Sequence, residues 1–412
     1  MRLERLCVRK EHTDAQAARG ILYLTDFRDA EEMLRQEYSG KVQMCYFDPP
    51  YATGQTFSCR RKVGEDDWKR GRGSLELMAY EDPADESAYI HMMRQALTLA
   101  RDLLCDKGVL FLHVDWRMSA HMRILMDELF GRENFLNEIV WAYQTGGRAK
   151  RFFSRKHDTI LLYSKTSRYY LDVFNVAERR ANARSNHMKR QIDADGRAYR
   201  SIRSGGKTYI YYDDDPVCPG DVWDDVSHLQ QKDPQRTGYD TQKPMRLLER
   251  IIRCSTKPGD IVCDLFAGSG TTLAAAANLG RKFVGTDRSP LAFHTARRRL
   301  LRYPVSFDAP EDPDTLQAEA EVTTAIANHE VRLQYFGPEK EGITYPDLVE
   351  SWSAGYLRDG AFMSLAHAQR SRRAPALKEM LEIPVLKGDI CIQITDVFGR
   401  SAHFIVPRED RI

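Results

Sequence analysis

The segment from Ile261 to Asp287 constrains the fold of this 412-residue chain more than any other. An apolar strand at 261–265 leads into the turn Gly268-Ser269-Gly270, an Ala-rich helical stretch and a second strand at 282–286 that ends in Asp287. This pattern is typical of a nucleoside-binding site: a strand, a glycine turn and a helix are followed by a second strand that ends in an acid about twenty residues after the turn. The acid binds the ribose hydroxyls of the nucleoside. Alternatively, the glycines only serve a tight strand-to-helix turn.

This glycine turn differs from the two common phosphate-binding turns. Leu273 stands where a dinucleotide fingerprint needs a small residue, and the chain has no Gly-Lys-Ser/Thr run here. The sequence therefore favours a cofactor with ribose and adenine but no phosphate, such as S-adenosylmethionine.

Strand and helix patterns alternate along most of the chain. This alternation predicts a doubly wound, mostly parallel α/β sheet with ligands at the carboxyl ends of its strands. We expect seven strands, near 21–24, 42–47, 109–114, 137–142, 158–164, 260–265 and 282–286. We expect helices near 27–38, 87–106, 117–130, 244–254, 271–279 and 289–302.

The tetrapeptide Asp48-Pro49-Pro50-Tyr51 follows the apolar run 42–47. Prolines remove backbone donors, so the Asp48 carboxylate and the Pro49 carbonyl can accept hydrogen bonds from one amino group. The Tyr51 ring offers a flat face for stacking on a planar base. A simple turn at a strand end is the alternative interpretation.

Taken together, these motifs resemble the amino-group DNA methyltransferases, and their order resembles the permuted β class. The resemblance extends over roughly residues 20 to 300, including the strand 109–115 and Thr241-Gln242-Lys243-Pro244. It implies S-adenosylmethionine as cofactor and a Rossmann-like methyltransferase sheet. It also implies a catalytic set of Asp48, Pro49, Pro50 and Tyr51, and a cofactor-binding set of Asp26, Lys243, Asp264, Phe266, Gly268, Gly270, Thr271 and Asp287.

Two members of the implied cofactor set have simpler explanations. Asp26, expected to meet the adenine, could instead cap a helix that starts near Phe27. Lys243, expected to border the methionine carboxylate, could be a solvated charge before the helix that Pro244 opens.

The expected reaction is methyl transfer to the N6 amino group of adenine in a base flipped out of the duplex. Cytosine N4 methylation is the nearest alternative, although in the family it more often accompanies serine at the first position of the tetrapeptide. The chain has no Pro-Cys dipeptide of the kind expected for attack at cytosine C5. A DNA-binding protein that keeps the fold without activity is the alternative from another class.

Charge is distributed unevenly, although the formal net charge is only +2. A stretch from Gly146 to Lys207 is rich in arginine, lysine and aromatic residues, which suits phosphate contacts and base recognition. A solvated surface is the alternative. The predicted DNA-binding residues are Arg148, Lys150, Arg151, Arg155 and Lys156.

Four parts are expected: a first catalytic part (1–144), a target-recognition region (145–235), a second catalytic part with the cofactor motif (236–303) and a small C-terminal extension (304–412). The segment 52–86 is expected to be a loop that closes on DNA or is ordered by a partner subunit. Residues 303–305 and 309–314 are expected to be a linker, and 390–395 with 403–406 a hairpin. The extension is expected either to contact DNA, through Arg370, Arg372 and Arg373, or to be a plain folding extension.

The remaining sequence features limit compartment and partners. Eight scattered cysteines without a CxxC pair indicate a reducing compartment and no metal site. The start lacks the features of a signal peptide, and no apolar run is long enough to cross a membrane, so we expect a cytoplasmic protein. Expected partners are double-stranded DNA, with a second copy of the chain and a restriction endonuclease as further candidates.

Overall fold

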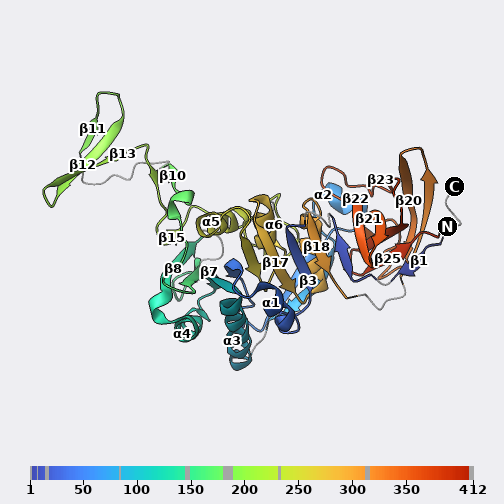
Figure 1. Cartoon of the computed structure of the whole chain (residues 1–412), viewed down its shortest axis with the longest axis horizontal. Helices are drawn as coiled ribbons and strands as arrows, with labels where there is room; N and C mark the ends of the chain where they lie inside the picture. The colour runs from blue at the N-terminus through green and yellow to red at the C-terminus, as the bar shows by residue number, and fades with distance from the viewer. Residues whose placement is uncertain are drawn as a thin grey trace.

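The computed structural model describes residues 2–6, 8–13, 18–82, 85–143, 149–179, 189–230, 233–310 and 316–407. Its centre is a large mixed sheet in the order β1-β25-β24-β21-β22-β2-β18-β3-β17-β16-β4-β7-β9-β8-β15 (Figure 1). Six neighbouring strands of this sheet are parallel. They are β18 (Val305–Asp308), β3 (Gly20–Leu24), β17 (Lys282–Asp287), β16 (Ile261–Asp264), β4 (Val42–Phe47) and β7 (Leu104–Val114).

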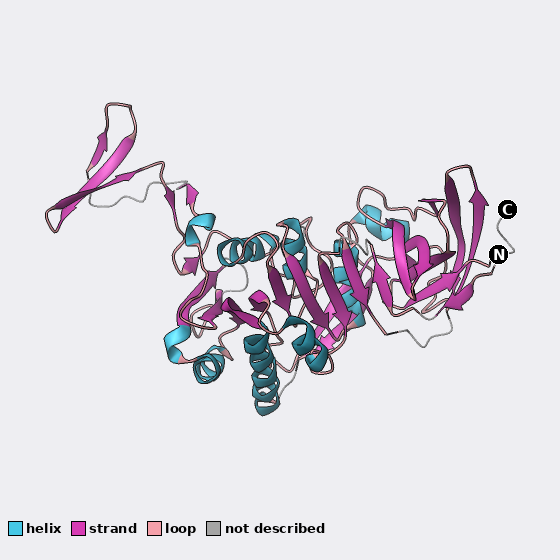
Figure 2. Ribbon diagram, in the orientation of Figure 1, coloured by secondary structure: helices cyan, strands magenta, loops and turns pink. Residues whose placement is uncertain are grey.

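Helices cover both faces of the parallel strands, as a doubly wound sheet requires (Figure 2). One face packs against α5 (Met245–Ser255), α6 (Thr271–Asn278) and α7 (Pro290–Leu300), and the other against α1 (Glu31–Tyr38), α3 (Glu86–Leu103) and α4 (Ser119–Phe130). All six residues of β4 are buried, which explains its continuous apolar run.

All seven predicted strands are present, but the sheet does not end at seven. Beyond β7, the sheet continues with β9 (His157–Ser164), which is antiparallel to β7, then with β8 (Phe135–Ala142), which is antiparallel to β9, and with β15 (Val222–Trp223), which is parallel to β8. On the other side, β18 pairs with β2 (Lys10–His12), which connects it to the C-terminal strands. The predicted count was too low because β2, β15 and β18 are short, and because strands of the C-terminal part join the same sheet through β2. Val305, predicted to lie in a linker, begins β18.

The segment 52–86 is not the loop that the sequence predicted. It forms β5 (Thr56–Arg61), α2 (Gly64–Arg70) and β6 (Leu75–Glu81), with β5 and β6 antiparallel. The C-terminal part of the same chain orders it, because the buried Arg61 guanidinium donates to Glu350 at 2.7 Å. A single arginine in a basic run carries no sign of such a partner 289 residues away.

Residues 316–407 form a β-rich module with its own core, within the range predicted as a C-terminal extension. The predicted hairpin occurs as β24 (Asp389–Asp396) and β25 (Ser401–Ile405), which pairs with β1 (Glu4–Leu6). The other strands are β19 (Gln317–Thr324), β20 (Asn328–Gly337), β21 (Val349–Arg358), β22 (Ala361–Gln369) and β23 (Met380–Pro384). Arg370, one of the arginines expected to suit DNA, is buried and donates to backbone carbonyls of Pro346 and Pro375, so it has a structural role here.

A separate three-stranded sheet projects from the β8 end of the molecule (Figure 1). It consists of β11 (Arg190–Ile192), β12 (Ala198–Ser204) and β13 (Lys207–Tyr212), and short strands β10 (Glu178–Arg179) and β14 (Pro216–Val217) lie at its base. Two one-turn 3₁₀ helices, η1 (Arg132–Asn134) and η2 (Val173–Val176), complete the described elements. None of the helices in the described ranges is long and apolar enough to span a membrane.

Candidate active site

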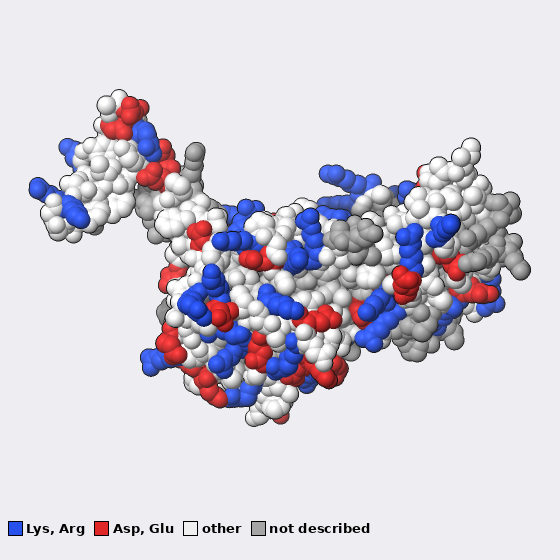
Figure 3. All heavy atoms as spheres, in the orientation of Figure 1, with Lys and Arg blue, Asp and Glu red and all other residues white. Residues whose placement is uncertain are grey.

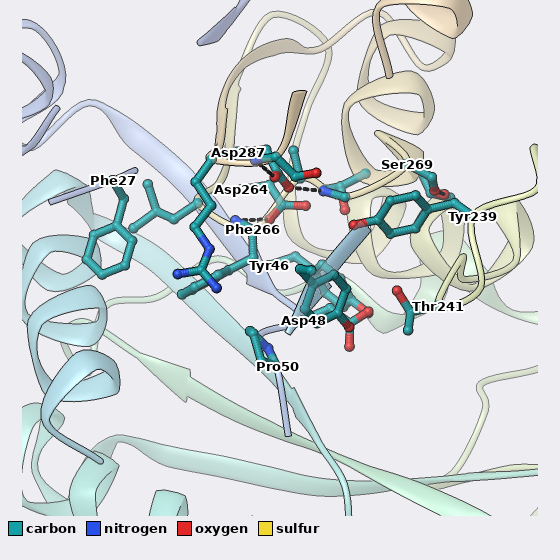
Figure 4. A pocket seen from close by; sticks show the side chains of 18 of the residues that line it. Phe27, Tyr46, Asp48, Pro50, Tyr239, Thr241, Asp264, Phe266, Ser269 and Asp287 are labelled. Carbon is teal, nitrogen blue, oxygen red and sulfur yellow. Dashed lines mark hydrogen bonds between the residues drawn. The ribbon is translucent and has the colours of Figure 1, made fainter. Parts of the chain in front are cut away.

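A cavity opens at the carboxyl ends of four parallel strands, β3, β4, β16 and β17, and contains about 960 Å³ of free space including its mouth. Each strand ends in or just before an acidic residue: Asp26, Asp48, Asp264 and Asp287 respectively. All four line the cavity, so the two predicted motifs meet although they are more than two hundred residues apart (Figure 4).

Asp264 and Asp287 are held by backbone amides. Asp264 accepts from the Phe266 N–H at 3.0 Å, and Asp287 accepts from Gly268 at 2.7 Å and Ser289 at 2.8 Å. Burial nevertheless raises the pKa of Asp264 to about 7 and that of Asp287 to about 6. A cation in this cavity would favour the ionised form of both carboxylates.

The glycine turn has two different roles. Gly268 lines the cavity with a φ of +51°, a backbone conformation that a side chain disfavours. Gly270 is not among the lining residues; a Cβ there would lie 2.5 Å from Ala296 Cβ of α7. Phe266, Lys243 and Thr271, also predicted to bind the cofactor, do line the cavity.

Asp26 does not cap a helix, because α1 begins at Glu31 with Ala30 at its N-cap and without a side-chain cap. It lines the cavity, and one of its carboxylate oxygens accepts from the Arg28 N–H at 3.0 Å within the turn before α1. The Arg28 guanidinium also binds both carboxylate oxygens, at 2.8 and 2.7 Å. Arg28 therefore already supplies donors to both oxygens of this acid.

The tetrapeptide places Asp48 in a hydrogen-bond network. Tyr51 Oη donates to Asp48 Oδ1 at 2.5 Å, and Lys243 Nζ donates to Oδ2. Lys243 also approaches Tyr51 Oη at 3.3 Å. The Lys243 ammonium thus contacts the predicted catalytic acid in the structure, where the resemblance implied a cofactor carboxylate. Pro50 lies beside Asp48 in the cavity wall.

A second layer of polar groups supports Tyr51. Its ring stacks on His113 with a centroid distance of 6.3 Å, and His113 bonds to Tyr46 Oη at 2.9 Å and to Asp158 at 3.1 Å. Burial opposes ionisation of Asp158, but His113, Lys243 and the Tyr143 hydroxyl together outweigh burial and lower the Asp158 pKa to about 2. Sequence reasoning missed this layer, although His113 stood out as a polar residue in an apolar strand.

Aromatic residues outside the predicted motifs close the cavity. Tyr80, from β6, and Tyr239 stack with ring centroids 6.5 Å apart, and both line the cavity together with Thr241. Sequence reasoning missed Tyr80 because it lies in the segment predicted to be a loop. Tyr239 and Thr241 lie just before Lys243, so proximity to that predicted residue was the available signal.

The predicted DNA-binding stretch follows β8 and precedes β9. Of its five residues, Arg148 lies outside the described residues, Lys150 and Arg151 are exposed, and the Arg155 guanidinium lies over the Trp116 ring at 3.6 Å. Lys156 is half-buried. Because Val114 pairs with Thr159 at the end of β7, this stretch lies at the same sheet edge as Asp48.

Comparison with known proteins identifies the family. Residues 42–298, more than half of the chain, match the N6/N4 family described as DNA methylase. The type II methyltransferase M.EcaI of Enterobacter cloacae is 29% identical over 306 residues, covering 63% of this chain and 65% of M.EcaI, just under two thirds of its length. The DNA adenine methyltransferase YhdJ of Escherichia coli K12 is 27% identical over 273 residues, covering 66% of this chain and 80% of YhdJ.

Solved structures with a similar chain path include TTHA0409 of Thermus thermophilus, described as a DNA modification methylase. It is 19% identical, covers 72% of this chain and 100% of its own, and has a TM-score of 0.42. The cytosine-N4-specific PvuII DNA methyltransferase is 16% identical, covers 69% of this chain and 86% of its own, and has a TM-score of 0.44. On the match across residues 42–298, this chain belongs to the N6/N4 family of DNA methylases, the amino-group DNA methyltransferases.

Proposed function

We propose that this protein transfers a methyl group from S-adenosylmethionine to the N6 amino group of adenine in DNA. The observation that carries the proposal is the meeting of Asp48 with Asp264 and Asp287 in one cavity at the carboxyl edge of the sheet. One end of this cavity has the acceptors that an amino group needs, and the other has the acids that a cationic nucleoside needs.

The cavity suits S-adenosylmethionine in charge and shape. Its described lining residues include four acids, Asp26, Asp48, Asp264 and Asp287, but only two cations, Lys243 and Arg288. Acidic groups are therefore in excess in the cavity. Asp287 keeps free lone pairs for ribose hydroxyls after accepting two backbone N–H groups. When bound, the cofactor supplies an activated methyl group on a positively charged sulfur.

Asp48 and its neighbours would act on the target nitrogen. The Asp48 carboxylate and the Pro49 carbonyl accept its hydrogen bonds, which turns the nitrogen lone pair out of the ring plane. Lys243 now occupies Asp48 Oδ2, so the target amino group must replace it there. Such bonds to a charged acceptor contribute about 1.5–3 kcal/mol. Tyr51, whose ring His113 supports, would stack on the flipped base.

Adenine is the favoured base, and the protein would act as a modification enzyme in the cytoplasm. Aspartate is a charged, acceptor-only first residue of the tetrapeptide, whereas serine would offer a weaker hydroxyl. The match to YhdJ, named a DNA adenine methyltransferase, supports adenine. The motif order supports the permuted β class, and a match to the HindVI Mod subunit of Haemophilus influenzae supports a restriction-modification role.

Asp48→Ala tests the proposal. It should lower transfer of labelled methyl groups to DNA by at least about a hundredfold, the loss typical of removing one preorganised transition-state contact. S-adenosylmethionine binding, measured by calorimetry, should change little because Asp48 lies at the base end of the cavity. Methyl transfer at the normal rate by Asp48→Ala would remove Asp48 from the reaction.

A further inference from the structure

A second, larger hollow lies beside the active-site cavity, between the β5–α2–β6 segment, α7 and the C-terminal module. We call it the basic cleft. Eleven of its described lining residues are arginine or lysine and three are acidic. Five of the cations are exposed, Arg60, Arg70, Arg72, Arg302 and Arg372. Figure 3 shows Lys and Arg side chains projecting from the edge of the molecule near α2.

The acids in the basic cleft are too few to neutralise its cations. Glu350 is buried and binds both Arg61 and Arg298, and Asp240 accepts from Ser58 Oγ at 2.9 Å. Burial, and then repulsion from Arg372 and Arg298, lowers the pKa of Lys62. Two exposed cations of the cleft are paired with acids outside its lining, Arg70 with Asp66 at 3.1 Å and Arg60 with Glu76 at 3.6 Å. Arg72, Arg302 and Arg372 have no ion-pair partner among the described residues, so positive charge remains in excess in the cleft.

The walls of the cleft are built from ordered structure. Arg61, at the end of β5, is bound to Glu350 of β21 and to Thr295 of α7 at 2.9 Å, which connects the three walls. The cations that line the cleft project from this frame. Holding like charges together costs electrostatic free energy, which a polyanion would recover on binding.

The cleft and the active-site cavity share one wall. In the segment 237–243, Tyr239, Thr241 and Lys243 line the cavity, while Gly238 and Asp240 line the cleft. The N–H of Arg60 donates to the Gly238 carbonyl at 2.9 Å, which fixes this wall to β5. A ligand in the cleft would thus lie next to the active-site cavity.

We propose that the basic cleft holds the phosphate backbone of duplex DNA flanking the target base, so that the C-terminal module forms part of the DNA-binding surface. This inference rests on the proposed function for the identity of the polyanion. It assigns the segment 52–86 and the C-terminal module a common purpose, to build a second DNA contact apart from the region 145–235.

The test combines Arg72→Gln, Arg302→Gln and Arg372→Gln in the full-length protein. All three are exposed, and none lines the active-site cavity. We expect DNA affinity, measured by fluorescence anisotropy, to fall at least tenfold and the slope of log affinity against log salt to flatten by about 0.9 for each lost phosphate contact. S-adenosylmethionine affinity, and kcat at saturating DNA, should stay within about twofold of the unmodified protein.

A matched control replaces three exposed cations away from the cleft, Arg101→Gln, Lys107→Gln and Arg132→Gln, and should keep both affinity and slope. Equal DNA affinity and slope in the cleft variant and the control would overturn the inference, as would an equal loss in both. If the unmodified protein binds DNA but transfers no methyl group, the proposed function fails, and the binding comparison still decides the role of the cleft.

Discussion

The active-site cavity and the basic cleft share a wall but carry opposite charge. Among the described lining residues, the cavity has four carboxylates against two cations, and the cleft has eleven cations against three acids. In each region burial penalises the charge in excess, since it raises the pKa of Asp264 and lowers that of Lys62. The chain as a whole has a net charge of only +2, so the local imbalance, not the sum, indicates the charge of each ligand.

Removing Asp287, the proposed ribose acceptor, should produce the largest effect on the cavity side of this comparison. Asp287→Ala should weaken S-adenosylmethionine binding roughly 10- to 100-fold, since hydrogen bonds to a charged group contribute about 1.5–3 kcal/mol. Calorimetry gives the affinity. Asp26→Ala is the control, with a smaller loss expected because Arg28 already binds both Asp26 oxygens. Unchanged affinity in Asp287→Ala would place the ribose elsewhere.

Cofactor affinity should rise with pH. Asp264 and Asp287, with pKa values of about 7 and 6, are partly protonated in the free protein at mildly acid pH. A cationic ligand binds the ionised carboxylates better than the protonated ones, so binding lowers their pKa values and releases protons. The affinity should therefore increase between about pH 5.5 and 7.5, by up to about tenfold for each unit by which binding lowers a pKa. A flat profile over this range would contradict the cationic-ligand account. In the Asp287→Asn variant, which lacks one of the two titrating carboxylates, the affinity should rise less steeply with pH.

The basic stretch before β9 should contribute less than the cleft. Lys150→Gln with Arg151→Gln removes two exposed charges at the sheet edge that carries Asp48. We expect DNA affinity to fall a few fold. The slope of log affinity against log salt should flatten by at most about 1.8, which corresponds to the loss of two phosphate contacts. Salt titration by anisotropy measures both. An unchanged slope would show that these two residues are solvated surface.

The sequence predicted the parallel part of the fold well. Strands such as 42–47 and 282–286 are recognisable because burial on both faces makes them mostly apolar. The six expected helices occur within a few residues of their predicted bounds. Local sequence also marked the cavity acids Asp48, Asp264 and Asp287, since each follows or ends a buried strand.

The rest depends on contacts between distant residues. DNA contact was among the expectations for the segments that hold Arg72 and Arg372, but their meeting with Arg302 in one cleft could not be predicted, because the fold brings the three segments together. Likewise Arg61 and Arg370 have the same local character as solvated arginines, yet both are buried and bonded. The His113–Asp158 pair joins β7 to β9, and no spacing rule connects residues 45 positions apart.

The most direct test of the central claim is mass spectrometry of nucleosides from DNA treated with the purified protein and S-adenosylmethionine. The account predicts N6-methyladenine as the main product, and its loss in Asp48→Ala, because an acceptor-only carboxylate accepts the hydrogen bonds of the adenine amino group. N4-methylcytosine as the main product would contradict the adenine assignment. A DNA sample without any methylated base would contradict the enzyme itself.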